Sequence, residues 1–256
     1  MSILKYFLCL SITIIHSPAI YTVAEIQGFR CNDDVHGPNV HNYLVKLLVD
    51  TYVFDYDDFS YHTTYFCSGS IIGKKWIISV AHCFPDNEKV TIMSAKERIL
   101  GFSKQIIVHP NFIFDPNFNY YNGQNDLALV KTEKPIQFNA FTQPIGLAQL
   151  GAFGNTGIIA GYEISSSEFP LESVAVVNQC ECAPNDSIIL CAQSLTYMES
   201  IASGAALKTN DGLIGILSHI SSLPTGQQYF VVDISIHFEW IQKVTKIKTL
   251  HDIIAK

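Results

Sequence analysis

The residues with the clearest chemical potential are a histidine and an aspartate beside apolar segments. His82 stands directly before Cys83 in the segment Cys67–Phe84, which reads CSGSIIGKKWIISVAHCF. A histidine can take up and return a proton near neutral pH, and a buried carboxylate can orient its ring and stabilise its cation. Asp126 stands at the head of the apolar segment Asn125–Lys131. Taken singly, each also fits an ordinary structural role, the histidine beside a cysteine and the aspartate in a turn.

Short strands are expected to position these residues. Apolar runs recur along the chain with turn residues between them, which favours a β-sandwich or barrel over a βαβ sheet. The runs are Leu44–Val49, Ser70–Ile72, Trp76–Val80, Gln105–Val108, Leu127–Val130, Gly157–Ala160, Ser173–Val177, Ile188–Ala192, Leu213–Leu217 and Tyr229–Ile234. The tail differs, because its apolar residues recur at the spacing of an amphipathic helix. These residues are Trp240, Val244, Ile247 and Ile254.

Two polar segments rich in aromatic residues interrupt the strand pattern. Asp50–Phe66 combines aspartates with tyrosines, and Asn111–Gln124 is rich in Asn, Phe and Tyr. We interpret both as loops. They are either ordinary solvated loops or surfaces for a partner, since polar aromatic side chains bind at low entropic cost.

The N-terminal segment has the form of a secretory signal peptide. Met1–Ser17 carries one lysine and then an apolar stretch shorter than the ~20 residues that span a bilayer. Small residues at Thr22 and Ala24 predict a signal over residues 1–24, with cleavage nearer Ala19 or retention as a membrane anchor as the alternatives. We therefore expect a secreted, extracellular protein that has no membrane contact after signal removal.

Composition argues against several kinds of partner. The 256 residues include 16 Lys and Arg against 23 Asp and Glu, a net charge of −7. An acidic chain without a basic run is not expected to bind nucleic acid. Histidines and cysteines do not fall at metal-ligand spacings, and neither common glycine-rich phosphate loop is present, so we expect no metal and no cofactor. The oligomeric state is left open.

The segment around His82 resembles the histidine segment of the chymotrypsin/trypsin-like serine proteases, the S1 family. Asp126 matches the buried aspartate of that family, and Phe230–Ile241 (FVVDISIHFEWI) resembles its last strand and C-terminal helix. The similarity covers roughly Ile26 to Lys248. It implies an all-β fold of two six-stranded antiparallel β-barrels followed by a C-terminal helix. The three parts are expected over residues 25–140, 141–236 and 237–255.

The resemblance also assigns a site. It implies a catalytic triad of His82, Asp126 and Ser203, in the family's order along the chain. The oxyanion-binding amides would be those of Ile201 and Ser203, and Ser218 matches the serine that supports the aspartate. The remaining positions belong to the specificity pocket, with Tyr197 at its base and Ile220 and Tyr229 on its walls.

The cysteines agree with this assignment. Seven are present, and removal of the signal leaves six, an even number that predicts three disulfides in an oxidising compartment. The resemblance implies the bonds Cys67–Cys83 and Cys191 with Cys180 or Cys182, the other of the two reaching Cys31.

The nucleophile segment departs from the family pattern. Gly-Asp-Ser-Gly-Gly-Pro in the family is matched here by IASGAA, which keeps only Ser203 and Gly204. Ala202 replaces the aspartate that pairs with the new N-terminus after activation, and Glu25 before Ile26 does not suit trypsin-like cleavage. Bulky residues stand at the pocket walls.

These departures lead to two functional hypotheses. We expect a secreted serine protease homologue with impaired catalysis, a pseudoprotease that binds an extracellular protein. It would act as a regulator or cofactor in a fluid such as an immune or reproductive fluid. The alternative is an active serine endopeptidase of narrow specificity that uses His82, Asp126 and Ser203.

Overall fold

The computed structural model describes residues 41–54, 60–85, 89–94, 96, 98–113, 124–148, 156–163, 170–179, 189–194, 200–223 and 226–247. Several sequence predictions lie outside these residues and stay predictions. They concern the signal peptide, Ile26, Cys31, Cys180, Cys182 and Tyr197.

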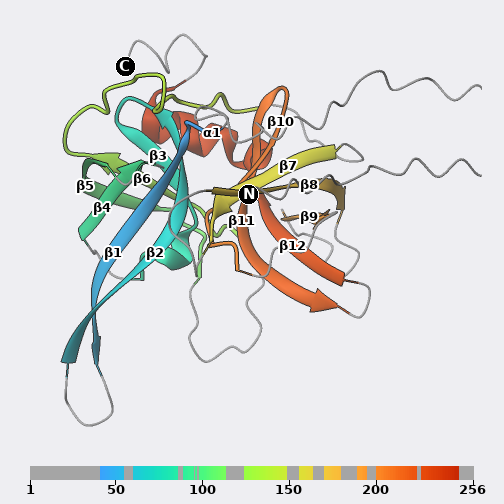
Figure 1. Ribbon diagram of the computed structural model, residues 1–256, viewed down its shortest axis with the longest axis horizontal. Helices are drawn as coiled ribbons and strands as arrows, with labels where there is room; N and C mark the ends of the chain where they lie inside the picture. The colour runs from blue at the N-terminus through green and yellow to red at the C-terminus, as the bar shows by residue number, and fades with distance from the viewer. Residues whose placement is uncertain are drawn as a thin grey trace, which may run out of the picture. The chain divides into compact units, whose positions relative to one another are not determined.

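The described residues form two closed antiparallel β-barrels of six strands each, which confirms the predicted fold class (Figure 1). The first barrel has the strand order β1-β2-β3-β6-β5-β4, and the second has the order β10-β11-β12-β9-β8-β7. The strands of the first are β1 (Leu44–Phe54), β2 (Ser60–Gly73), β3 (Trp76–Ser79), β4 (Lys89–Ser94), β5 (Ile99–Val108) and β6 (Ala128–Thr132). Those of the second are β7 (Thr156–Tyr162), β8 (Pro170–Gln179), β9 (Ile189–Ser194), β10 (Ala206–Thr209), β11 (Gly212–Leu223) and β12 (Gly226–Asp233).

Alternation of side chains fills each barrel. Along β4, Val90, Ile92 and Ser94 are buried while the residues between them are more exposed, as expected for a strand with one face toward a core. β3 is more fully buried, with Ile77 and Ile78 inaccessible to solvent. Burial on both faces fixes the register of β3. Because β3 ends shortly before His82, this register also fixes the position of the His82 backbone.

One long hairpin corrects an interpretation from the sequence. The segment Asp50–Phe66, interpreted as a loop, instead continues β1 and β2 in register out to the pair Phe54↔Ser60. Asp50 pairs with Thr64, whose hydroxyl donates to the aspartate at 2.7 Å. The polar and aromatic residues of this segment have the composition of a loop, although its backbone forms a continuous antiparallel ladder.

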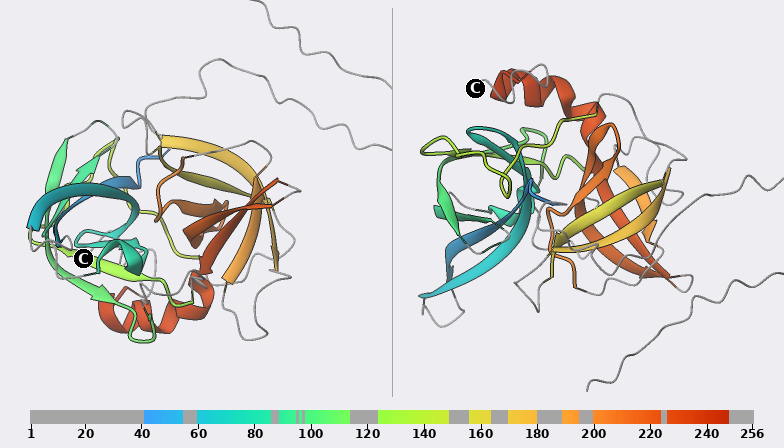
Figure 2. Two further views of the ribbon diagram at one scale, coloured as in Figure 1. Left: turned by 90° about the horizontal axis from the view of Figure 1, so that it is seen from below. Right: turned by 45° about the horizontal axis from the view of Figure 1, so that its top comes forward.

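The C-terminal helix α1 spans Ile234–Thr245, so it begins before the predicted residue 237 (Figure 2). Asp233 caps its start, since the carboxylate accepts a hydrogen bond from the Ser235 amide at 2.7 Å. Lys246 adopts a left-handed conformation with φ of 62° and ends the helix. The rest of the predicted helix, from residue 248 onward, lies outside the described residues. Within the described residues, no helix has the length and apolar character needed to cross a membrane.

The two barrels share contacts around Ser68 of β2. Its amide donates to the carbonyl of Ser203 at 2.8 Å, and its hydroxyl accepts from the amide of Tyr162 at 3.0 Å. Its carbonyl accepts from the hydroxyl of Ser79 at 2.7 Å. A single strand residue thus connects β3 of the first barrel to β7 and to the Ser203 segment of the second.

Candidate active site

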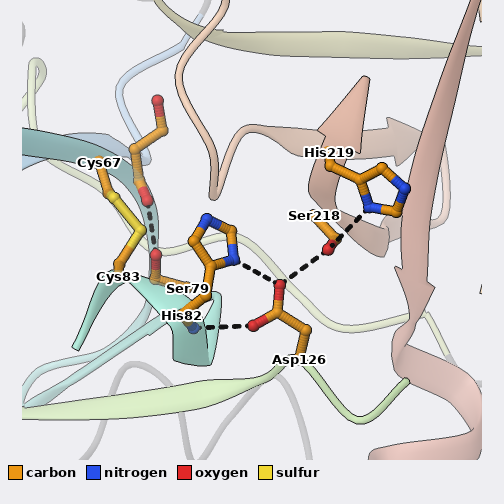
Figure 3. Close-up of polar contacts among 8 residues, drawn as sticks. Cys67, Ser79, His82, Cys83, Asp126, Ser218 and His219 are labelled. Atoms are coloured by element: carbon orange, nitrogen blue, oxygen red, sulfur yellow. Dashed lines mark hydrogen bonds and ion pairs between the residues drawn. A yellow bond between two sulfur atoms is a disulfide. The ribbon is translucent and has the colours of Figure 1, made fainter. Parts of the chain in front are cut away.

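His82 is held by a short 3-10 helix, Ala81–Cys83, directly after β3. The disulfide Cys67–Cys83 ties this turn to β2, with 6.5 Å between the two Cα atoms, as predicted from the sequence (Figure 3). The Tyr65 hydroxyl also donates to the carbonyl of Cys83 at 2.8 Å. The backbone that carries His82 is therefore fixed on both sides.

Asp126 orients the imidazole of His82. One carboxylate oxygen accepts from Nδ1 of His82 at 2.7 Å, and the other accepts from the backbone amide of the same residue at 2.8 Å. Because Asp126 accepts the Nδ1 proton, the lone pair of a neutral His82 lies at Nε2. That nitrogen can take a proton from a hydroxyl group, which is the task of a general base in acyl transfer.

Ser218 of β11 completes the surroundings of the carboxylate. Its hydroxyl donates to Asp126 at 2.8 Å. Burial alone would raise the pKa of the Asp126 carboxyl, but the hydrogen bonds and charge of His82, with the Ser218 hydroxyl, hold that pKa below its usual value. The side chain of Asp126 is inaccessible to solvent and stays ionised through three donors.

The structure adds a second imidazole to this network, which sequence reasoning missed. Nδ1 of His219 lies 3.3 Å from the Ser218 hydroxyl oxygen (Figure 3). Since that hydroxyl has one proton and donates it to Asp126, Nδ1 of His219 is the donor in this pair. The ring stacks on Phe230, with centroids 4.4 Å apart and planes 5° apart. The pKa of His219 is lowered overall. Burial is the main cause and the charge of His82 adds to it, while the charge of Asp126 acts in the opposite direction. The position of His219 next to Ser218 was the one indication in the sequence.

The segment containing Ser203 is packed through its neighbours. The amide of Ala202 donates to the carbonyl of Tyr162 at 2.7 Å, and the amide of Gly204 donates to the carbonyl of Leu217 at 2.8 Å. Within the part of the chain that the structure describes, the amides of Ile201 and Ser203 donate no hydrogen bond. The two amides predicted to bind an oxyanion therefore alternate with two that are used within the protein.

Gly204 has a structural reason to be glycine. Its φ is 86°, a conformation that other residues rarely adopt, and a Cβ atom here would overlap the carbonyl oxygen of Ser68. The close approach of the two segments allows the hydrogen bond from the Ser68 amide to the carbonyl of Ser203.

Apolar packing holds the residues before Ser203. Ile201 and Ala202 are both buried, and Ile201 belongs to the core cluster of the second barrel. Its side chain packs so closely over Gly161 of β7 that a Cβ atom on that glycine would lie 3.1 Å from Ile201 Cγ1. Ser200 hydrogen-bonds the carboxylate of Glu163 at 3.1 Å. The residues directly before Ser203 are therefore held by apolar burial and by this side-chain hydrogen bond.

The two predicted wall residues are direct cross-strand partners. Ile220 of β11 pairs with Tyr229 of β12. Tyr229 is inaccessible to solvent and packs in the same cluster as Ile201, with Ile220 against that cluster. The Tyr229 hydroxyl donates to the side-chain oxygen of Gln227 at 2.6 Å, so its polar end is satisfied.

The remaining predicted site features are only partly described. Cys191 of β9 is disulfide-bonded, and its predicted partners Cys180 and Cys182 lie outside the described residues. No three histidine, cysteine or acidic side chains in the described ranges are grouped so that they could hold a metal ion.

Comparisons with known proteins identify the family. Residues 51–241 match the family model described as Trypsin. Trypsin-1 of Salmo salar is 34% identical over 83 residues, which are 32% of this chain and 34% of the relative. Trypsin of Sus scrofa is 30% identical over 111 residues, 42% of this chain and 48% of the relative. These alignments span between a third and a half of the curated relatives.

Solved structures extend the likeness to most of the chain. HL collagenase superposes with a TM-score of 0.66 at 22% identity, covering 83% of this chain and 96% of the collagenase. The scabies mite inactivated protease paralogue S-I1 gives a TM-score of 0.63 at 15% identity, covering 82% of this chain and 97% of the paralogue. At such low identity these structures support the fold alone. With the family model matching most of the chain, the protein belongs to the trypsin family of serine proteases.

Proposed function

We propose that this protein is a trypsin-family homologue with impaired peptidase chemistry that acts by binding another extracellular protein. The observation that carries the proposal is the buried methyl group of Ala202. In active family members, as the resemblance implies, an aspartate here pairs with the freed N-terminal amine and shapes the oxyanion loop. An alanine offers that amine no counter-charge.

Loss of that ion pair affects stabilisation of the oxyanion in the transition state of acyl transfer. Each correctly aimed oxyanion donor contributes about 3–4 kcal/mol to the transition state. Ile201 and Ser203 supply the two amides, but a β-branched residue restricts the backbone at Ile201 and apolar packing fixes its side chain. Packing against the core of the second barrel therefore holds this loop, in place of an ion pair formed on activation.

Substrate binding is impaired in the same region. Tyr229 and Ile220 stand at positions where the family has small residues that leave room for a substrate side chain. The burial of Tyr229 within the second barrel cluster supports a filled pocket. Secretion is supported by the predicted signal peptide and by disulfides, which persist in oxidising compartments.

A second candidate function, an active endopeptidase of narrow specificity, is favoured by one specific observation. The His82–Asp126–Ser218 network is intact, and the Ile201 and Ser203 amides are uncommitted among the described residues. Slow acylation by a reactive probe requires a proton acceptor for the Ser203 hydroxyl, and Nε2 of His82 is the candidate.

The two candidates separate by covalent labelling. The purified protein is treated with a fluorophosphonate probe beside Ser203→Ala, with Ser200→Ala as a matched control from the same segment. We expect wild-type labelling no greater than that of Ser203→Ala. Labelling that persists in Ser200→Ala and disappears in Ser203→Ala would establish the active peptidase instead.

The binding role has its own test. Wild-type protein and Ser203→Ala are used to recover partners from the native fluid, and the affinity of a recovered protein is then measured for both. The proposal expects equal affinities, because binding does not pass through the serine hydroxyl. A partner held only by the wild type would be a trapped substrate.

A further inference from the structure

A cavity of about 240 Å³ lies at the end of β3 opposite His82. It is bounded by the turn between β2 and β3, by β6 and by the last residues of α1. Its lining includes Lys74, Lys75, Trp76, Lys131, Lys246 and Ile247. We call this cavity the lysine pocket.

Charge distinguishes this pocket from the rest of the chain. Four of the 16 basic residues of an acidic protein line it, and none of its described lining residues is Asp or Glu. The C-terminal end of α1 adds a partial negative charge of about half a unit. The ammonium groups of Lys74, Lys75 and Lys131 outweigh that charge, so the pocket attracts anions.

The backbone around the pocket is fixed before any ligand arrives. The carbonyl of Lys75 accepts from the Thr132 amide at 3.0 Å, and the carbonyl of Lys74 accepts from the Ile136 amide at 2.6 Å. These bonds attach the turn to β6 and to the segment that follows it. The side chains of the two lysines keep partial exposure.

Two further contacts place the other walls. Lys131 is the cross-strand partner of Trp76, and its Nζ lies 5.2 Å from the centroid of the Trp76 ring. Ile247 closes the floor so tightly that a Cβ atom on Gly73 would lie 2.9 Å from its Cδ1. Glycine at the turn therefore lets the end of α1 approach and bring Lys246 to the rim.

Size and donor chemistry limit the ligand. The volume equals that of several water molecules at about 30 Å³ each, which suits a small ion with part of its hydration shell. Drug-sized sites are larger, at about 300–1,000 Å³. Lysine ammonium groups act as compact point charges with several donors, a common means of binding phosphate.

We propose that the lysine pocket binds a tetrahedral oxyanion group, a phosphate or a sulfate, either free or as an ester on a larger molecule. The site lies away from His82 and Asp126, so it is independent of whether the protein cleaves peptides. Binding would bring an anionic molecule to the face formed by the β2–β3 turn and the end of α1.

The test uses the mature full chain and four named probes. Inorganic phosphate, inorganic sulfate, phosphoserine and tyrosine O-sulfate are titrated by calorimetry at low and at physiological ionic strength. We expect saturable binding that weakens with salt. Comparing the affinities of the free ions with those of the esters distinguishes a site for a small ion from a site that binds an ester. Comparing the affinities of the phosphate and sulfate compounds identifies the preferred group.

Matched variants assign the binding to the pocket. Lys75→Gln with Lys131→Gln should weaken binding at least tenfold, and Lys75→Gln alone by a smaller factor. Lys104→Gln with Lys208→Gln changes the net charge equally and should leave the affinity within twofold. Absence of saturable binding, or equal weakening by both pairs, overturns the proposal. Circular dichroism of each variant confirms that it is folded, and Lys75→Gln alone decides the matter if the first pair does not fold.

Discussion

Acidification should destabilise the protein through a buried histidine of α1. His237 is 4% exposed, and its Nε2 has no hydrogen-bond partner among the described residues. Its ring packs edge-on against His109, with centroids 4.7 Å apart. Burial first, and then the nearby His109, lower the pKa of His237 from 6.5 to about 4. The cation therefore has no compensating contact in the described surroundings.

The sign and size of the effect follow from that pKa. Between pH 6.5 and about 4 the unfolded chain binds a proton at this residue and the folded chain does not, so stability falls as the pH falls. With these two pKa values, linkage gives a loss of about 2 kcal/mol at pH 5 and about 3 kcal/mol at pH 4, relative to pH 8. Below pH 4 the loss from His237 levels off.

Urea denaturation followed by circular dichroism at pH 8, 6, 5 and 4 measures this loss. His237→Phe keeps an aromatic ring in the same place and removes the titration, so its unfolding free energy should fall by about 2 kcal/mol less between pH 8 and 5. His109→Phe should also flatten the profile, because burial lowers the pKa of His109 as well. An identical pH profile for wild type and His237→Phe would refute the reasoning.

Three other changes have expected outcomes. Replacing both Cys67 and Cys83 by serine opens a loop closed over 16 residues and should lower the free energy of unfolding by about 3 kcal/mol in urea denaturation, whereas an unchanged midpoint would contradict this. Gly204→Ala should cost more than about 2 kcal/mol, seen as a lower Tm, because its φ is positive and its Cβ meets the Ser68 carbonyl. Tyr229→Ala should cost about 3–5 kcal/mol by leaving a cavity in the second barrel, and a smaller loss would mean that the cluster collapses around the site.

The sequence predicted the elements whose local pattern matches their environment. The predicted run Leu213–Leu217 lies in β11, and the run Tyr229–Ile234 covers most of β12. β4 and β10 were missed because they are short and mix polar with apolar residues. Each also pairs with a strand distant along the chain, as in Val49↔Val90 and Leu207↔Ile159.

Part of the site could not be predicted from sequence, for the same reason. The resemblance named His82, Asp126 and Ser218, which lie on three separate segments that the barrels bring together. No sequence pattern indicates that His219 hydrogen-bonds Ser218, because the contact depends on the local backbone of β11, where the register with β12 shifts between Leu217 and His219. The bulge is a tertiary feature of the second barrel.

The presence of residues typical of a catalytic site is a weak guide to activity here, because most of these residues also have a structural role. Asp126 accepts hydrogen bonds from both barrels, so its loss would leave buried donors without an acceptor. Gly204 is fixed by its contact with Ser68. The Ser203 hydroxyl differs, since among the described residues the hydrogen bond of this residue is made by its backbone carbonyl. Selection for folding alone would preserve the first two residues and leave that hydroxyl free to vary. The reactivity of Ser203, measured directly, is therefore more informative than the intact His82–Asp126 pair.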